Sequence, residues 1–171
     1  MKLNLREAIV FGLLGAIMFV LKFIMEVLPN IHLLGVFIVA ITVVYRAKAL
    51  YPIYIFVLLN GFFAGFTTWW IPYLYIWTIL WAITMLLPKE MSKKVAIPVY
   101  SIVCALHGLC YGILYAPAQA LMFGLDFKGM LTWIAAGFYF DIIHCIGNFA
   151  LGFLIVPLAE TLRKAHKTAE K

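Results

Sequence analysis

Residues 8–28 read AIVFGLLGAIMFVLKFIMEVL, and this stretch decides the fold class. It is apolar apart from Lys22 and Glu26, and about 20 such residues let a helix cross the roughly 30 Å hydrocarbon core of a bilayer. The run is too long for the core of a signal peptide and lacks a small-residue cleavage site. We therefore predict a membrane-spanning helix that stays in the protein.

The composition of the whole chain extends this prediction beyond one helix. Of its 171 residues, 66% are apolar and 12% are charged, and the mean hydropathy is +1.06. Soluble domains are about half apolar and a quarter charged. The chain is therefore predicted to be an all-α integral membrane protein, with a single transmembrane domain over residues 1–171 and structured outer loops.

Apolar runs recur along the chain, and lysine and arginine orient them. We predict six spans in one bundle, approximately at residues 8–28, 31–45, 50–66, 71–87, 95–115 and 133–158. Basic residues are retained on the cytoplasmic side. With both termini cytoplasmic, every basic residue except Lys22 and Lys128 falls in an inner segment: Lys2, Arg6, Arg46, Lys48, Lys89, Lys93, Lys94, Arg163, Lys164, Lys167 and Lys171. This explains the net charge of +6 without nucleic acid.

The predicted outer connections differ in character from the short inner ones. They are residues 26–32, residues 67–70 and the longest, APAQALMFGLDFKGM, at residues 116–130. Binding residues concentrate in structured loops that a rigid scaffold positions. We therefore expect a ligand that arrives from outside.

Small residues form a stripe on the first predicted helix. Ala8, Gly12 and Ala16 are four residues apart, with Gly15 beside them. Such a stripe lets another helix approach closely within lipid. The spacing leaves two interpretations open, packing inside this protein or docking of a partner helix.

Polar residues inside apolar spans are costly, and they are usually functional or paired. Two sets share a helical face by their spacing: His107, Tyr111 and Tyr115 in the fifth span, and Asp141, His144 and Asn148 in the last. Both stripes run from the middle of the membrane outward, which predicts a shared outward-opening cavity. The alternative is hydrogen bonding that only holds helices together.

Residues 67–81, TTWWIPYLYIWTILW, contain four of the five tryptophans. Trp70, Tyr73, Trp77 and Trp81 follow steps of 3, 4 and 4 and would share a helical face. Trp69 is expected to be an interfacial anchor, and Trp81 to lie too deep for ligand contact. We predict that Trp70, Tyr73 and Trp77 form one wall of the cavity, the alternative being core or lipid-facing packing.

Four further polar residues receive weaker assignments. Lys22 and Glu26 are expected to form an i, i+4 ion pair, Asn60 lies near the middle of the third span, and His32 is only a minor candidate for ligand contact.

The HxxxN pattern of His144 and Asn148 resembles one motif of intramembrane CAAX-type proteases, but the paired-glutamate motif of that family is missing.

Enzyme signatures are otherwise missing from the sequence. It contains no HExxH, GxSxG or GxxxxGK[ST] pattern. We predict no catalytic residue, no metal ligand and no cofactor. A stand-alone small-solute membrane carrier, or less readily a small intramembrane enzyme, remains an open interpretation.

About six short helices, two cytoplasmic ends, the small-residue stripe and structured outer loops together resemble the substrate-binding S components of energy-coupling factor (ECF) vitamin transporters. The resemblance implies a high-affinity subunit of an ABC-type importer in a prokaryotic cell membrane. It also implies partners, a transmembrane coupling subunit that docks on Ala8, Gly12 and Ala16 and two cytoplasmic ATPases that hydrolyse ATP. The aromatic and polar residues favour a flat heteroaromatic vitamin or precursor.

Overall fold

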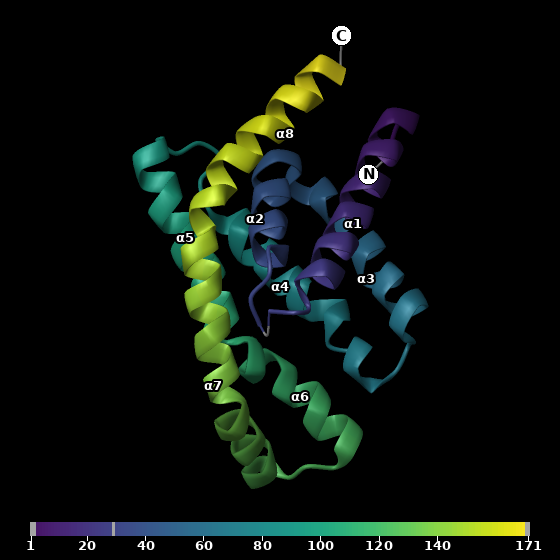
Figure 1. Cartoon of the computed structure of the whole chain (residues 1–171), viewed down its shortest axis with the longest axis vertical. Helices are drawn as coiled ribbons and strands as arrows, with labels where there is room; N and C mark the ends of the chain where they lie inside the picture. The colour runs from purple at the N-terminus through teal and green to yellow at the C-terminus, as the bar shows by residue number, and fades with distance from the viewer. Residues whose placement is uncertain (1–2, 29, 170–171) are drawn as a thin grey trace.

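The computed structural model describes residues 3–28 and 30–169, and over these ranges it is helical without any strand (Figure 1). The elements, with η marking short 3₁₀ helices, are α1 (Leu5–Met25), α2 (Leu34–Tyr45), η1 (Arg46–Ala49), α3 (Leu50–Ala64), η2 (Thr68–Trp70), α4 (Tyr73–Leu86), α5 (Lys93–Leu109), α6 (Tyr111–Phe123), α7 (Phe127–Leu151), η3 (Gly152–Leu154) and α8 (Ile155–Ala169).

Five helical stretches are long and apolar enough to cross a membrane: Leu5–Met25, Leu34–Ala64, Thr68–Leu86, Lys93–Phe123 and Phe127–His166. The all-α class is thus confirmed, and the helices are compatible with a multi-pass membrane protein. The predicted spans 31–45 and 50–66 both overlap the single stretch Leu34–Ala64, in which the chain turns at Arg46 with a φ of 53°. The count of six spans stays a prediction.

The predicted outer loop at residues 116–130 is wrong, because most of it is helix. The fifth predicted span, 95–115, divides at Cys110, where α5 ends and α6 begins. The connection between α6 and α7 consists only of residues 124–126, and it starts at Gly124 in the left-handed region with a φ of 66°. Tyr111 and Tyr115 therefore lie on α6, and not on the helix of His107.

Helix α1 begins three residues before the predicted span. Asn4 and Glu7 form a capping box, in which each side chain bonds the other residue's backbone N–H. Such reciprocal bonds satisfy two of the free amides at a helix start. At the other end of α1, the predicted ion pair of Lys22 with Glu26 is confirmed.

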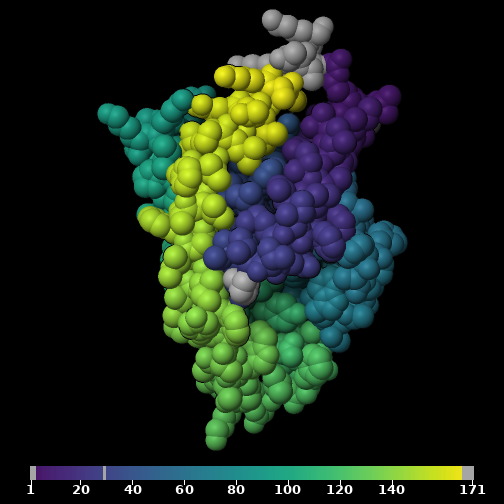
Figure 2. Space-filling model, viewed as in Figure 1, coloured from purple at the N-terminus to yellow at the C-terminus, as the bar shows by residue number. Residues whose placement is uncertain are grey.

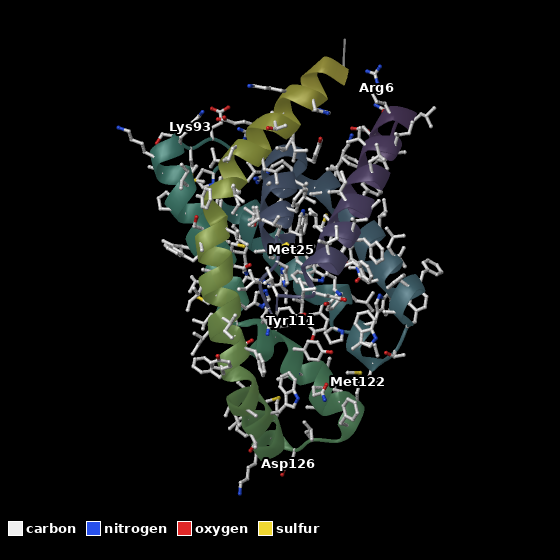
Figure 3. The ribbon with its side chains drawn as sticks, in the orientation of Figure 1. Arg6, Met25, Lys93, Tyr111, Met122 and Asp126 are labelled. Carbon is white, nitrogen blue, oxygen red and sulfur yellow. The ribbon has the colours of Figure 1, made fainter. Side chains whose placement is uncertain are left out.

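The start of α1 and the end of α8 lie at the same end of the molecule (Figure 1). Arg6 and Lys93 are at this end and Asp126 is at the opposite one (Figure 3). Lys2 and Lys171, which the topology prediction also used, lie outside the described residues, as does the side chain of Lys167. The orientation of the two ends relative to a membrane stays a prediction.

Helix α2 forms the centre of the bundle. Its residues from Leu34 to Val43 are buried except Phe37, as expected for a helix that is hydrophobic all round. It packs against α4 and α8, while α1 packs along α3, and α5 along α7. Figure 2 shows α1, α7 and α8 over one face of the molecule, and their outward side chains include the exposed Ile9, Leu13 and Phe149. An apolar exterior of this kind suits contact with lipid.

The turn after α2 is fixed by α4. The Trp81 indole N–H donates to the backbone carbonyl of Arg46 at 3.1 Å, and the Arg46 guanidinium donates to the carbonyl of Met85 at 2.7 Å. These bonds give Trp81 a structural role, and its lying too deep for ligand contact stays a prediction.

Glycines allow α5 and α6 to pack closely against α7 and against η3, which extends α7. A Cβ atom at Gly108 would lie 2.8 Å from Asn148 Nδ2, and one at Gly152 would lie 2.6 Å from Ser101 Cα. A Cβ at Gly112 would overlap the carboxylate of Asp141. The backbones thus approach more closely than any side chain would allow.

Replacing Gly152 by alanine is expected to destabilise the fold, because the new methyl group meets the backbone of Ser101. Overpacking of this kind costs about 1–3 kcal/mol. Gly137→Ala on α7 is the matched control, since nothing lies within 4 Å of a Cβ at that position. Thermal unfolding in detergent should show a lower melting temperature for the first variant only, and equal temperatures would contradict the close approach.

Candidate functional site

Side chains from five parts of the chain meet in what we call the aromatic–histidine cluster. It consists of His32 from the α1–α2 connection, Tyr73 and Trp77 from α4, His107 from α5, Tyr111 from α6 and His144 from α7. Tyr111 lies near the middle of the molecule in Figure 3. The cluster joins residues of both predicted stripes to residues of the predicted aromatic wall, while the outward-opening cavity stays a prediction.

Trp77 is at the centre of this cluster and is only 1% exposed. Its ring centroid is 5.4 Å from that of Tyr73, and 5.8 Å from those of both His107 and Tyr111. These separations lie within the 4.5–7 Å range in which aromatic rings attract each other. The indole is therefore held by rings from three helices.

His32 belongs to the cluster, although the sequence analysis treated it as only a minor candidate for ligand contact. Its ring centroid is 4.7 Å from that of His144 and 6.4 Å from that of Trp77. Burial lowers the pKa of His32 to about 4, so its imidazole is neutral at pH 7. Its position before α2 follows no helical periodicity, so no spacing rule could connect it to residues more than 40 positions away.

Three polar residues of the two stripes each use one side-chain atom to hold the structure. Asp141 Oδ1 accepts a bond from the backbone N–H of Gly112 at 3.0 Å. Asn148 Nδ2 donates to the Cys104 carbonyl at 3.1 Å. His107 Nε2 lies 3.1 Å from the Ile76 carbonyl, to which it can only donate. The helix-to-helix hydrogen bonding considered as the alternative is thus present. It uses only one of the two polar atoms in each of these side chains.

Asp141 in particular has a clear structural task. Gly112 is the second residue of α6, so this carboxylate satisfies an amide at the start of a helix that has no cap from its own chain segment. A negative charge is also favourable at the positive end of a helix dipole. The bond thereby fixes the point at which α6 turns away from α5.

The second atoms of these groups have no partner. In the part of the chain that the structure describes, the buried side-chain nitrogen and oxygen atoms without a hydrogen bond are His32 Nδ1, Trp77 Nε1, His107 Nδ1, Asp141 Oδ2, His144 Nε2 and Asn148 Oδ1. Every one belongs to the cluster or to the two polar residues beside it. An unpaired buried polar group costs about 1–3 kcal/mol, so six in one place point to a binding site for a molecule with polar groups.

The predicted residues Tyr115 and Trp70 lie at different distances from this centre. Tyr115 is next to the cluster, since its ring is 6.1 Å from that of Tyr111 and stacks at 5.6 Å on Trp133, which the sequence analysis did not select. Trp70 instead donates its indole N–H to the Val57 carbonyl of α3 at 2.8 Å. Its neighbour Trp69 makes the ring contact with Tyr73, at 5.5 Å.

The small-residue stripe of α1 divides into two parts. A Cβ at Gly15 would lie 2.7 Å from the Ile55 side chain, so Gly15 serves the packing of α1 on α3. Nothing lies within 4 Å of a Cβ at Gly12, and Ala8 is exposed while Ala16 is partly exposed. The predicted docking residues therefore face outward from the bundle.

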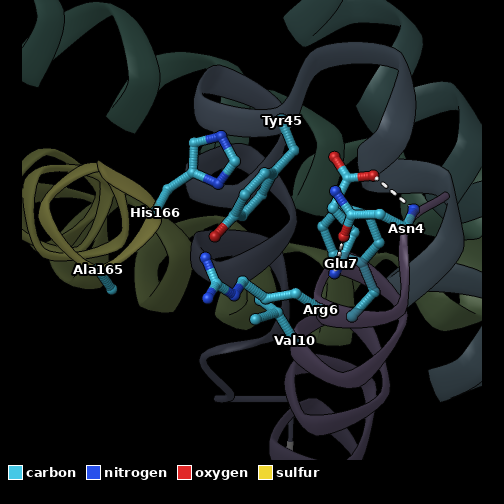
Figure 4. Close-up of a pocket in the computed structure, with 8 residues that line it drawn as sticks. Asn4, Arg6, Glu7, Val10, Tyr45, Ala165 and His166 are labelled. Carbon is cyan, nitrogen blue, oxygen red and sulfur yellow. Dashed lines mark hydrogen bonds between the residues drawn. The ribbon is translucent and has the colours of Figure 1, made fainter. Parts of the chain in front are cut away.

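A separate cavity of about 320 Å³ lies between α1, α2 and α8 (Figure 4). None of the predicted substrate-binding residues lines it; its lining is Asn4, Arg6, Glu7, Val10, Phe11, Tyr45, Ala165 and His166. The Glu7 carboxylate is already paired with Lys48. We therefore place the candidate site at the cluster, where the unpaired polar atoms gather.

Neither Asn60 nor the metal-binding side-chain types add a further candidate site. Asn60 donates to the Phe56 carbonyl within its own helix, at 2.8 Å. Across the described residues, no group of three or more His, Cys, Asp or Glu side chains could hold a metal ion.

When the chain was compared with known proteins, no family model, curated protein or solved structure matched it.

Proposed function

We propose that this chain is the substrate-binding membrane subunit of an importer of the energy-coupling factor type, and that it takes up a vitamin or vitamin precursor. The observation that carries the proposal is the aromatic–histidine cluster with its unpaired polar atoms. Ligand sites are mostly apolar and contain a few polar groups that fix orientation. The cluster has this composition, and it draws on helices from most of the chain.

The proposed substrate is a flat heteroaromatic compound, of flavin, pyridine, pyrimidine or benzimidazole type. Trp77, Tyr73 and Tyr111 offer ring faces and edges for stacking. His107 Nδ1 and Asn148 Oδ1 are unpaired atoms that can accept hydrogen bonds from ring N–H groups, amines or hydroxyls. Aromatic packing would supply most of the affinity, and the polar atoms would determine which ring is accepted.

The proposed partners are a transmembrane coupling subunit and two cytoplasmic ATPases. The outward-facing Ala8, Gly12 and Ala16 support docking of a partner helix on α1, because small residues permit close helix contact in lipid. In this scheme the chain binds substrate and the partners supply the energy of ATP hydrolysis. The six-span topology with both ends cytoplasmic belongs to the same proposal.

Binding is the first property to test. The chain should be purified in detergent, and any small molecule that accompanies it should be identified by mass spectrometry. We expect one heteroaromatic compound at close to one equivalent, and saturable quenching of tryptophan fluorescence when it is added back to ligand-free protein. The proposal would be overturned if no compound were retained and no heteroaromatic vitamin changed the fluorescence.

A further inference from the structure

The unpaired atoms of the site divide unequally between donors and acceptors. His107 Nδ1 is an acceptor, because Nε2 of the same ring already donates to the Ile76 carbonyl. Asn148 Oδ1 is an acceptor too, because it is an amide oxygen. Asp141 Oδ2 is an acceptor when the aspartate is ionised. Against these three stands one fixed donor, Trp77 Nε1. The nitrogens of His32 and His144 can take either role, depending on the tautomer.

The charge of the site is equally one-sided. Asp141, which is 5% exposed, is the acidic residue of the site, and no lysine or arginine belongs to the cluster. Lys22, whose charge acts on His32 of the cluster, is already paired with Glu26. A buried anion is costly unless a positive group pairs with it, and here it would also meet the repulsion of a carboxylate.

We infer that the site selects a neutral or cationic heterocycle that brings several N–H or O–H donors, and that it rejects carboxylated or phosphorylated forms of the same ring. This inference rests on the proposed function and deepens it. The donors of such a ligand would satisfy His107 Nδ1, Asn148 Oδ1 and Asp141 Oδ2. One ring nitrogen or carbonyl would accept from the Trp77 indole.

Matched pairs of compounds that differ in charge provide the test. The pairs are nicotinamide with nicotinate, pyridoxine with its 5′-phosphate, thiamine with its monophosphate and riboflavin with flavin mononucleotide. Each is titrated into the full-length protein in detergent, with tryptophan fluorescence or calorimetry as the measurement. In any pair that binds, we expect the member without the anionic group to bind at least about tenfold more tightly.

The two possible failures can be told apart. Equal or tighter binding of the anionic member would overturn this inference and leave the proposed function standing. If neither member of any pair bound, nor any compound retained from cells, the proposed function itself would be overturned and this inference with it.

Asp141→Asn tests the role of the charge without removing the structural bond. The amide oxygen can still accept from the Gly112 N–H, while the second atom becomes an uncharged donor. We expect affinity for the preferred ligand to fall about tenfold and its advantage over the anionic member to shrink. If both affinities were unchanged, the carboxylate would not determine selectivity.

Asp126→Asn is the matched control. Asp126 also caps a helix, because its Oδ1 accepts from the Gly129 N–H at 2.7 Å, but it lies at the start of α7 and outside the cluster. The same atom replacement there should leave both affinities as they are. A parallel loss in the control would show that the effect comes from weakened capping, and it would overturn the assignment to Asp141.

Discussion

Trp77→Phe is expected to weaken ligand binding about 10- to 100-fold, which corresponds to about 1.4–2.8 kcal/mol. Phenylalanine keeps an aromatic ring in the cluster but removes the indole N–H, the one fixed donor among the unpaired atoms. A ligand acceptor placed against it would then be buried without a partner. Calorimetry in detergent measures the loss directly.

The stability of the ligand-free variant distinguishes a binding role from a packing role. In the described structure Trp77 Nε1 has no hydrogen-bond partner, so its removal breaks no hydrogen bond. Removing an unpaired buried N–H group is favourable, and this offsets part of the packing that the smaller ring loses. We expect the melting temperature to change little. If the melting temperature fell sharply while the affinity of the folded protein was unchanged, Trp77 would be a core residue and no more.

Trp81→Phe is the control on the same helix. Its indole N–H is bonded to the Arg46 carbonyl, so this substitution should cost about 0.5–1.5 kcal/mol of stability. Ligand affinity should be unaffected. The two tryptophans are thus expected to show opposite patterns, one in binding and the other in stability.

Gly12→Trp is expected to abolish uptake by blocking the docking surface on α1, without unfolding the protein. Nothing lies within 4 Å of a Cβ at this position, so the first atom of the new side chain meets no neighbour inside the bundle. It would instead hold a partner helix away from α1, where close approach depends on small residues. Co-purification with the coupling subunit and the ATPases, together with uptake of the identified ligand by cells, measures the effect.

Two variants on the same helix complete this experiment. Leu13→Trp introduces the same side chain at an adjacent position that is 60% exposed, and it should leave the association intact. Gly15→Trp would meet Ile55 and should lower stability. If the Gly12 variant still assembled with its partners and supported uptake, the docking assignment would be wrong. Ligand binding is measured separately on the purified protein, so that result would not change.

The sequence predicted the helical class well because hydropathy depends on composition alone. It predicted boundaries less well where a distant residue determines them. The run through Cys110 is continuously apolar, and nothing local signals that α5 ends there. The amide at the start of α6 is satisfied by Asp141, about 30 positions later in the chain, and such a contact has no trace in local periodicity.

The candidate site could be predicted only as far as residues keep helical spacing. His144 and Asn148 lie on one helix, and the structure brings both to the site. Trp70 was placed on the face of Trp77 on the assumption that one helix runs through Pro72. In the structure α4 begins after that proline, so Trp70 belongs to η2 and packs on α3.

The glycines between α5, α6 and α7 have a consequence for how such a protein could diversify. Because Gly108 and Gly112 let backbone and polar side chains meet directly, the spacing of α5 and α6 against α7 is set by the main chain. The identity of His144 could then change while the dimensions of the frame stayed constant. A lineage could acquire a new ligand by exchanging a few polar atoms, whereas a single added methyl group at either glycine would disturb the frame for every ligand.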